Sequence, residues 1–256
     1  MIVPIMSNHV QTERHGAVVV IRMARPEKKN ALTADMYTGM TEALREAQRD
    51  DGVRVVMITG AGGCFTSGND LRDFAATPPS DLESPVFQFL REISSCPKPI
   101  VAGVTGLAIG IGTTMLLHCD LVVADPATRF SLPFINLGLV PEAASSLLLP
   151  RLVGHVRASE LLLLGEMFDA VAAERFGIIN KMSATGAADA EAMAWAEALA
   201  AKAPNALRLS KALIKSESTG IVRRMQEEAR DFVPQLKGPE FEEALRAFME
   251  KRAPTF

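Results

Sequence analysis

The spacing of apolar and polar residues predicts alternating strands and helices over the first half of the chain. Helical spacing of apolar residues predicts a helix that Thr33 caps and a second helix from Val86 to Ile93. An alternation of strands and helices favours mainly parallel pairing with right-handed crossovers, and so an α/β fold. Short apolar runs predict the strands, at residues 18–22, 53–59, 100–104, 121–124 and 128–131.

The pattern changes along the second half of the chain. The first predicted strand forms a hairpin around Gly16 with the segment from Val10, and residues 72–85 are expected to form a mobile loop. From Val156 onward only helical periodicity is found, at 157–165, 170–176, 188–202, 204–215, 220–232 and 239–250. We assign residues 1–200 to an α/β core and 201–256 to a helical region. Its amphipathic helices would form oligomer contacts or pack on the chain's own core.

Composition narrows the class of protein. The chain has 256 residues, 48% of them hydrophobic, with a net charge of -3, which does not indicate a nucleic-acid-binding face. No apolar run reaches the roughly 18–20 residues that span a membrane, and the N-terminal segment lacks the features of a signal peptide. The three cysteines lie far apart, without metal-ligand spacing. We therefore expect a cytoplasmic protein with no metal site.

A candidate carboxylate lies in the stretch from Phe130 to Ser146. Pro141 precedes Glu142, and a run of small residues follows, which predicts a helix start with Glu142 in the first turn. A carboxylate there is favoured by the helix dipole. Taken alone, such a residue is more often an exposed glutamate at a helix start, so its role depends on what surrounds it.

Two glycine-rich loops, at residues 60–68 and 106–112, each follow a predicted strand. Neither has the Gly-Lys-Ser/Thr of a phosphate loop, and the second lacks the third glycine and the acidic residue of a dinucleotide site. The loops could instead supply backbone N–H groups, at Asn69 and Ile111. Two such donors converging on one oxygen atom would form an oxyanion hole.

Several motifs resemble those of the crotonase (enoyl-CoA hydratase/isomerase) superfamily. The resemblance implies a crotonase-like ββα spiral core, a C-terminal trimerisation region, and a homotrimer or dimer of trimers. It also implies acyl-CoA thioester substrates, so that coenzyme A enters with the substrate and no separate cofactor is expected. The motifs follow the family's order: RPEKKNALT at 25–33, FTSGNDL at 65–71, GLAIGIG at 106–112, CDLVVAD at 119–125, FSLPFINLGLVPE at 130–142 and PNALRLSKALIK at 204–215.

The resemblance assigns roles to individual residues. It places the oxyanion donors at Asn69 and Ile111, and it implies that Asp70 fixes the oxyanion loop by hydrogen-bonding its backbone. Lys211 and Lys215 could reach a coenzyme A phosphate in a neighbouring subunit or belong to a solvated helix face. Contacts with the adenine and phosphates of coenzyme A fall to Lys28, Lys29 and Ala31. The remaining substrate-binding residues are Ser67, Gly68, Asp70, Leu71 and Phe134.

The departures from the family pattern bear on the reaction. Hydratases of the family carry two glutamates, at positions that hold Thr114 and Phe134 here. The LGLVPEAASS segment resembles the 3,2-enoyl-CoA isomerase branch, whose catalytic glutamate matches Glu142. One carboxylate suits an allylic shift, because the same base can take a proton from C2 and return it to C4. The alternatives are hydration with one carboxylate, thioester hydrolysis or a lyase reaction, and a non-catalytic acyl-CoA-binding trimer.

Overall fold

The computed structural model describes residues 9–215 and 218–256. The N-terminal segment, on which the signal-peptide expectation depends, lies largely outside these residues. No described helix is both long and apolar enough to span a membrane.

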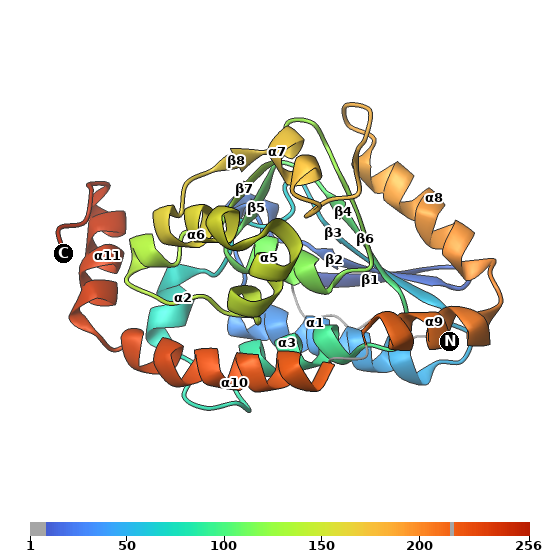
Figure 1. The fold of residues 1–256 in the computed structure, drawn as a ribbon, viewed down its shortest axis with the longest axis horizontal. Coiled ribbons are helices and arrows are strands. Elements are labelled where there is room, and N and C mark those ends of the chain that lie inside the picture. Colours follow the sequence, from blue (N-terminus) through green and yellow to red (C-terminus); the bar gives the residue numbers. More distant parts are fainter. Residues whose placement is uncertain (1–8, 216–217) are drawn as a thin grey trace.

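A six-stranded sheet forms the centre of the molecule (Figure 1). β1 and β2 form the expected antiparallel hairpin, while the other neighbouring strands pair in parallel, as predicted. In spatial order the strands are β1 (Val10–His15), β2 (Val18–Met23), β3 (Val55–Gly60), β4 (Ile100–Val104), β6 (Leu121–Ala124) and β9 (Lys181–Met182). The α/β prediction is confirmed.

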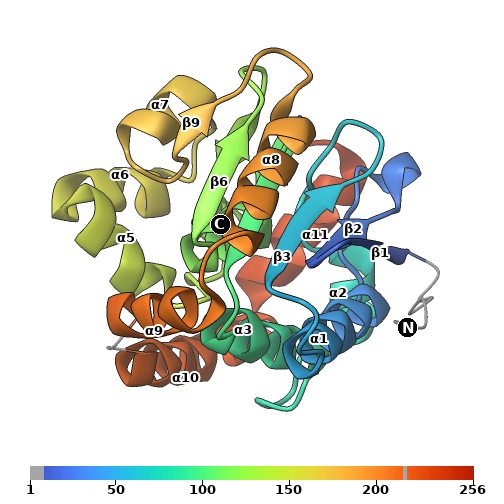
Figure 2. The ribbon, with the colours of Figure 1, turned by 90° about the vertical axis from the view of Figure 1, so that its right-hand side faces the viewer.

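Alternate residues of the strands face two different layers. Val18 and Val20 of β2 pack with the alanines of α8 (Ala188–Ala200), whereas Val19 and Ile21 belong to the main core. Figure 2 shows α8 across one side of the sheet, with α1 (Ala34–Arg49) and α3 (Pro85–Ser95) beneath the strands. Because successive side chains of a strand point to opposite faces, strands covered on both faces are apolar throughout.

A second, three-stranded sheet contains β5 (Leu107–Ile109), β7 (Arg129–Ser131) and β8 (Phe168–Asp169). The expectation of helices alone after Val156 is therefore wrong, since β8 and β9 lie in that part of the chain. Both strands have only two residues. They are too short to show an alternating pattern, and only pairing with earlier strands defines them.

Helix starts follow local capping where a side chain supplies it. Thr33 accepts a hydrogen bond from the N–H of Met36 and caps α1, as expected. Asp70 caps α2 (Leu71–Ala76), so part of the segment expected to be a loop is helical. After the second glycine loop, α4 (Ile111–Thr114) is followed by a 3-10 turn at Met115–His118, not by one continuous helix.

Helices make up most of the second half of the chain. α9 to α11 end the chain, and Phe232 of α10 and Phe241 of α11 are buried in the main core. The boundary between residues 200 and 201 remains a prediction. These helices are α5 (Ser145–Val153), α6 (His155–Leu164), α7 (Ala170–Arg175), α9 (Pro204–Ile214), α10 (Ser218–Gln235) and α11 (Pro239–Glu250); two further 3-10 turns lie at Pro26–Lys28 and Ile135–Leu137.

Candidate active site

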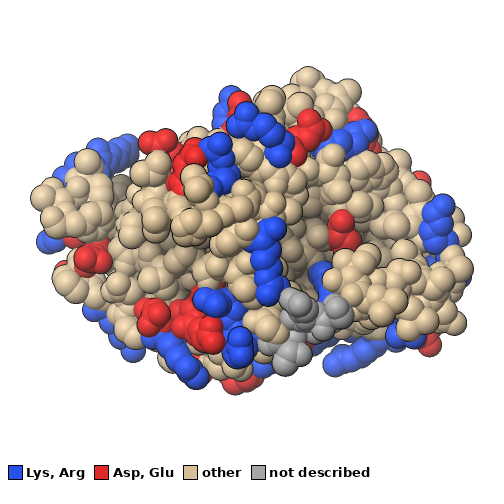
Figure 3. All heavy atoms as spheres, viewed as in Figure 1, with Lys and Arg blue, Asp and Glu red and all other residues tan. Residues whose placement is uncertain are grey.

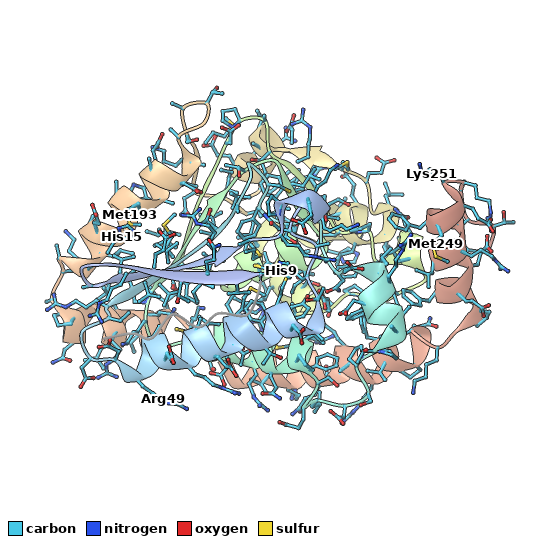
Figure 4. All side chains as sticks on the ribbon, turned by 180° about the vertical axis from the view of Figure 1, so that it is seen from behind. His9, His15, Arg49, Met193, Met249 and Lys251 are labelled. Carbon is cyan, nitrogen blue, oxygen red and sulfur yellow. The ribbon has the colours of Figure 1, made fainter. Side chains whose placement is uncertain are left out.

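A cavity of about 600 Å³ lies between the two glycine loops, α2 and the ends of α10 and α11. Figure 4 shows the molecule from behind, with α11, marked by Met249 and Lys251, at the same end as α2. Ten of the eleven predicted site residues line this cavity, and the exception is Glu142. The other lining residues are Arg72, Phe74, Leu107, Ile109, Gly110, Pro133, Leu137, Leu139, Phe232 and Phe248.

The two glycine loops run side by side along one wall of the cavity. A parallel β-bridge joins Thr66 to Ala108. The N–H of Thr66 donates to the carbonyl oxygen of Leu107, and the N–H of Ile109 donates to the carbonyl oxygen of Thr66. Gly68 has a φ of +91°, and a Cβ atom there would lie 2.9 Å from the carbonyl oxygen of Ile109. Only glycine tolerates both the backbone conformation and this approach.

The predicted oxyanion donors are available at this wall. Asn69 follows Gly68, and Ile111 follows Gly110, whose φ is +57°. Within residues 9–215 and 218–256, neither backbone N–H of these two residues has a hydrogen-bond acceptor. Ile111 is the first residue of α4, so its N–H has no acceptor within the helix. Two unpaired donors beside one cavity can bind an oxygen atom that carries negative charge.

Tyr37, whose role the sequence motifs did not predict, holds the side chain of Asn69. The Tyr37 hydroxyl donates a hydrogen bond of 2.5 Å to Oδ1 of Asn69. Burial, and next the nearby carboxyl of Glu142, raise the pKa of Tyr37 well above its usual value, so the hydroxyl keeps its proton. A buried polar group is normally hydrogen-bonded, so the single tyrosine, on the apolar face of α1, was a signal for such a partner.

The turn from Lys28 to Ala31 forms another part of the cavity wall. Asn30 is fully buried in a left-handed conformation, with a φ of +53°. Its amide nitrogen donates to the carbonyl groups of Ala61 and Cys64. The backbone carbonyl of Asn30 accepts a hydrogen bond from the Thr66 hydroxyl. That hydroxyl oxygen in turn accepts a hydrogen bond from the N–H of Gly68. Asn30 thus connects the predicted coenzyme A turn to the first glycine loop.

The role expected for Asp70 is wrong in its detail. One carboxylate oxygen accepts from the N–H groups of Arg72 and Asp73, and the other pairs with Arg25 at 2.7 Å. The side chain therefore caps α2 and does not bind the backbone of the oxyanion loop. Burial alone would raise the pKa of Asp70, but the hydrogen bonds from Arg25 and the two N–H groups hold it below its usual value.

Glu142 is buried, with 2% of its surface exposed, so it is not an exposed glutamate at a helix start. Its Oε1 atom has no hydrogen-bond partner among the described residues. Burial raises the pKa of Glu142 to about 8, and the negative charge of Glu228 adds to this effect. The expectation that Glu142 lies in the first turn of a helix is wrong, because α5 begins only at Ser145.

Ala143 and Ala144 separate Glu142 from α5. Both have left-handed backbones, with φ angles of +59° and +54°. This conformation costs an L-residue roughly 1–2 kcal/mol, because Cβ approaches a carbonyl oxygen. The pattern of Pro followed by small residues predicts a helix start, and only tertiary contacts reverse that preference. We call residues 142–144 the Glu142 turn.

Two buried side chains hold the Glu142 turn. His118 Nε2 lies 2.8 Å from the carbonyl oxygen of Ala143, and burial lowers the pKa of His118 to about 4. The neutral ring must therefore carry its proton on Nε2 to donate this bond. Glu228 on α10 accepts from the N–H of Ala144 at 2.7 Å. A carboxylate at position 228, on the apolar face that includes Met225 and Phe232, was a sequence signal that was missed.

The expectation of a solvated helix face is wrong for Lys211, while contact with coenzyme A in a neighbouring subunit stays a prediction. Lys211 is buried and binds Asp120 and the carbonyl oxygen of Lys98, each at 2.6 Å, so it is not on a solvated face. Lys215 donates to the carbonyl oxygen of His118 at 2.8 Å. Both amines are therefore engaged within the chain and support the region around His118.

A cavity lined by two unpaired backbone donors is typical of enzymes that stabilise an enolate or a tetrahedral oxyanion. No group of His, Cys, Asp and Glu side chains in the described ranges could hold a metal ion. Residues 13–256 match the sequence profile of the enoyl-CoA hydratase/isomerase family. The chain belongs to this family, whose members act on acyl-CoA thioesters.

Individual relatives agree with this assignment. The 1,2-epoxyphenylacetyl-CoA isomerase of Escherichia coli is 33% identical, with 98% of this chain and 99% of the relative covered. The peroxisomal enoyl-CoA delta isomerase 3 of Mus musculus is 32% identical, with 96% and 80% covered. The solved structure of Pseudomonas aeruginosa OdaA is 46% identical, with a TM-score of 0.92 and 95% and 99% covered. The crotonase-like fold is thereby confirmed.

The buried carboxyl generates a prediction about stability. Since the folded-state pKa of about 8 exceeds the ordinary value of 4.5, the folded chain retains a proton that the unfolded chain releases between these values. The stability due to this group is complete below about pH 4.5 and is lost as pH rises towards 8. The free energy of unfolding of Glu142→Gln should therefore rise relative to that of the parent as pH increases across this interval. The expected change is about 1.4 kcal/mol for each pH unit.

Denaturant unfolding at pH 5, 6.5 and 8 measures this difference. Glu166→Gln, which neutralises an exposed glutamate, is the matched control and should show no such trend. A stability difference between Glu142→Gln and the parent that does not change with pH would contradict the raised pKa.

Proposed function

We propose that this protein is an enoyl-CoA isomerase that moves a double bond from C3–C4 to C2–C3 of an acyl-CoA thioester. The observation that carries the proposal is the buried Glu142 carboxyl with an unpartnered oxygen near the oxyanion wall. Asp70 also lines the cavity, but both of its oxygens are engaged. Thr114 and Phe134, at the positions of the two hydratase glutamates, carry no carboxylate, which favours a one-carboxylate reaction.

The reaction follows from the chemistry of these groups. The N–H groups of Asn69 and Ile111 bind the thioester oxygen and so make the C2 proton more acidic. The Glu142 carboxylate takes that proton, and the electrons of the C2–H bond form a dienolate whose charge lies on the thioester oxygen. Glu142 then returns the proton to C4, which leaves the double bond between C2 and C3. One oxyanion donor is typically worth about 3–4 kcal/mol in the transition state.

The carboxylate must approach C2 and C4 although Glu142 does not line the cavity. Catalytic contacts are often loose without substrate and shorten in the complex. The charge of Glu142 acts on the Tyr37 hydroxyl, which binds Asn69 at the cavity wall. This electrostatic interaction and the Tyr37–Asn69 hydrogen bond support placing the carboxyl near the oxyanion wall. Lys28, Lys29 and Ala31 would bind the nucleotide part of coenzyme A, which enters with the substrate, and we expect no other cofactor.

We also propose assembly into a homotrimer or a dimer of trimers. Figure 3 shows mostly uncharged residues over α5 and α6, with charged side chains of both signs dispersed around them. Large exposed apolar side chains that would be covered in an oligomer include Val156, Leu163, Leu164, Met167, Val171, Leu209, Leu213 and Ile214. The free cysteines support a reducing setting, which for this proposal is the cytoplasm.

Substitution of the proposed acid/base tests the reaction directly. Glu142→Gln should lower kcat for a 3-enoyl-CoA by at least about a hundredfold, because an amide cannot carry the proton. Its dissociation constant for a saturated acyl-CoA should stay within about threefold of the parent value, since the side chain does not line the cavity. Product analysis of a 3-enoyl-CoA and a 2-enoyl-CoA side by side identifies the reaction, with Glu166→Gln as the control.

Each alternative has its own outcome in that experiment. Fast hydration of the 2-enoyl-CoA that survives Glu142→Gln would contradict the assignment of this residue. Hydration that is lost with Glu142 would identify a one-carboxylate hydratase. Tight acyl-CoA binding without conversion of either thioester would identify a binding protein.

The pH dependence of isomerisation follows from the ionisation of Glu142. Because the carboxylate is the base, kcat/KM should rise about tenfold per pH unit below pH 8 and level off above it. Initial rates from pH 6 to 9.5 with a 3-enoyl-CoA give the profile. An acidic limb with a midpoint near 4.5, the ordinary glutamate value, would contradict a buried base.

Phe74 is expected to limit the length of the acyl chain. Among the described residues, it is the only one that lines both the main cavity and a neighbouring cavity of about 150 Å³ between α2 and α3. It is buried and packs edge-on against Phe232, with ring centroids 6.2 Å apart. Phe74→Ala should connect the two cavities and raise kcat/KM for a twelve-carbon relative to a six-carbon substrate by about tenfold, or 1.4 kcal/mol.

A matched control for this change is Phe248→Ala. Phe248 lines the main cavity but not the smaller one, so its truncation enlarges the site elsewhere. An equal change in chain-length preference in both variants would show that Phe74 does not separate the two cavities.

A further inference from the structure

A second buried carboxylate, Glu228, lies within electrostatic reach of Glu142 although it is 86 positions later in the chain. It is the charged group that acts on Glu142, and 8% of its surface is exposed. Glu228 does not line the cavity. Burying a carboxylate in an apolar helix face is unfavourable unless hydrogen bonds compensate for it, so its partners indicate what it does.

Both carboxylate oxygens of Glu228 accept hydrogen bonds from Ala144 and Ser146 at the start of α5. Oε2 accepts from the N–H of Ala144 at 2.7 Å. Oε1 accepts from the N–H of Ser146 at 3.1 Å and from its hydroxyl at 2.5 Å. Glu142 differs, since its Oε1 has no partner among the described residues. This contrast assigns proton transfer to Glu142 and a structural contact to Glu228.

The bonds of Glu228 compensate for two local deficits at once. The N–H groups of Ser145 and Leu147 donate to the carbonyl oxygens of Glu142 and Ala144, so the first deficit is the N–H of Ser146, which neither a local carbonyl nor a capping side chain satisfies. The second deficit is the left-handed pair Ala143 and Ala144, which an L-residue adopts only when its surroundings hold it. Glu228 binds one residue of that pair and the first turn of α5 together.

We propose that Glu228 is a positioning residue for the reaction: from α10 it holds the Glu142 turn in the conformation that sets the Glu142 carboxyl beside the oxyanion wall. His118 holds the other side of the turn, through the carbonyl oxygen of Ala143. The carbonyl of His118 itself is bound by Lys215, which follows α9. The region predicted for oligomerisation would thus also complete the catalytic turn. This inference rests on the proposed role of Glu142.

The charges around the pair define what a pH profile would report. Burial raises the pKa of Glu228, and the hydrogen bonds from Ser146 and Ala144 and then the charge of Arg224 on α10 only partly offset this. From α1, the Tyr37 hydroxyl is held in its neutral form, and His118 is neutral as well. On α3, Arg91 pairs with Glu83, and Glu92 pairs with Arg45 of α1. Arg151 on α5 also has an interaction partner, so it is not a free charge.

Two substitutions separate the hydrogen bonds of Glu228 from its charge. Glu228→Gln removes the charge and turns an NH₂ group towards backbone donors. It should lower the kcat of isomerisation at least tenfold and move the acidic limb of the pH profile to lower pH.

Glu228→Asp keeps the charge but shortens the side chain, so the carboxylate no longer reaches both backbone donors. It should lower kcat without moving that limb by more than 0.3 pH units, and it serves as the test if the Gln variant does not fold. KM should change by less than threefold in both.

The matched control is Asp231→Asn, which removes one exposed charge from the same helix and should change neither kcat nor the pH profile. A rescue variant tests the mechanism. Ala144→Gly in the Glu228→Gln background relieves the backbone strain and should recover at least threefold of the lost kcat. Parent kcat in both Glu228 variants would overturn the proposal. The proposal would also be overturned if Ala144→Gly does not recover the lost kcat and KM rises by the same factor. That combination indicates general damage to the structure of the site.

Hydrogen exchange distinguishes failure of this inference from failure of the proposed function. Without any substrate, amides of residues 139–149 should exchange at least tenfold faster in Glu228→Gln than in the parent or in Asp231→Asn. Faster exchange in a parent protein that isomerises no thioester would overturn the proposed function while the contact stands. Unchanged exchange in an active isomerase would overturn the positioning role alone.

Discussion

The burial of the Glu142 carboxyl is the constraint on which the rest of the site depends. A carboxyl group without a partner for one oxygen is unfavourable inside a protein, and burial raises its pKa to about 8. The surrounding structure must therefore hold it there. It does so with a strained backbone at Ala143 and Ala144, which His118 and Glu228 bind from two different elements. In the proposed reaction, the same raised pKa makes the group a base suited to near-neutral pH.

The cavity wall formed by the two glycine loops presents backbone N–H groups as its hydrogen-bond donors. The bridge between Thr66 and Ala108 sets two glycine loops beside each other, and the unpaired N–H groups of Asn69 and Ile111 follow the glycines. Because the donors belong to the main chain, their direction is determined by φ and ψ. Substitution of Asn69 or Ile111 would leave these N–H groups in place. The residues that matter for geometry are instead Gly68 and the partners of the loop, Asn30 and Thr66.

Local sequence patterns predicted the strands, the hairpin at Gly16 and the helix capped by Thr33, because these depend on contacts within a few residues or on one buried face. Ten of the eleven site residues line one cavity, since family motifs fall on loops that the strands bring together. The patterns failed at β8 and β9, which are too short to show a period. They also failed at the start of α5, where contacts from distant parts of the chain outweigh the helix-start signal of Pro141.

The sequence by itself predicted the α/β class, the glycine loops that line the cavity and Glu142 as the carboxylate to consider, because residue types and their order carry that information. Only the tertiary structure decided that Glu142 is buried, that Asp70 caps α2, and that Lys211 is held by Asp120. It alone brought Glu228 to Ala144 and Tyr37 to Asn69. Solvent exclusion and hydrogen bonding between distant residues exist only after the chain has packed. For this reason the sequence could predict most of the residues of the site, whereas the ionisation of those residues is a property of the fold.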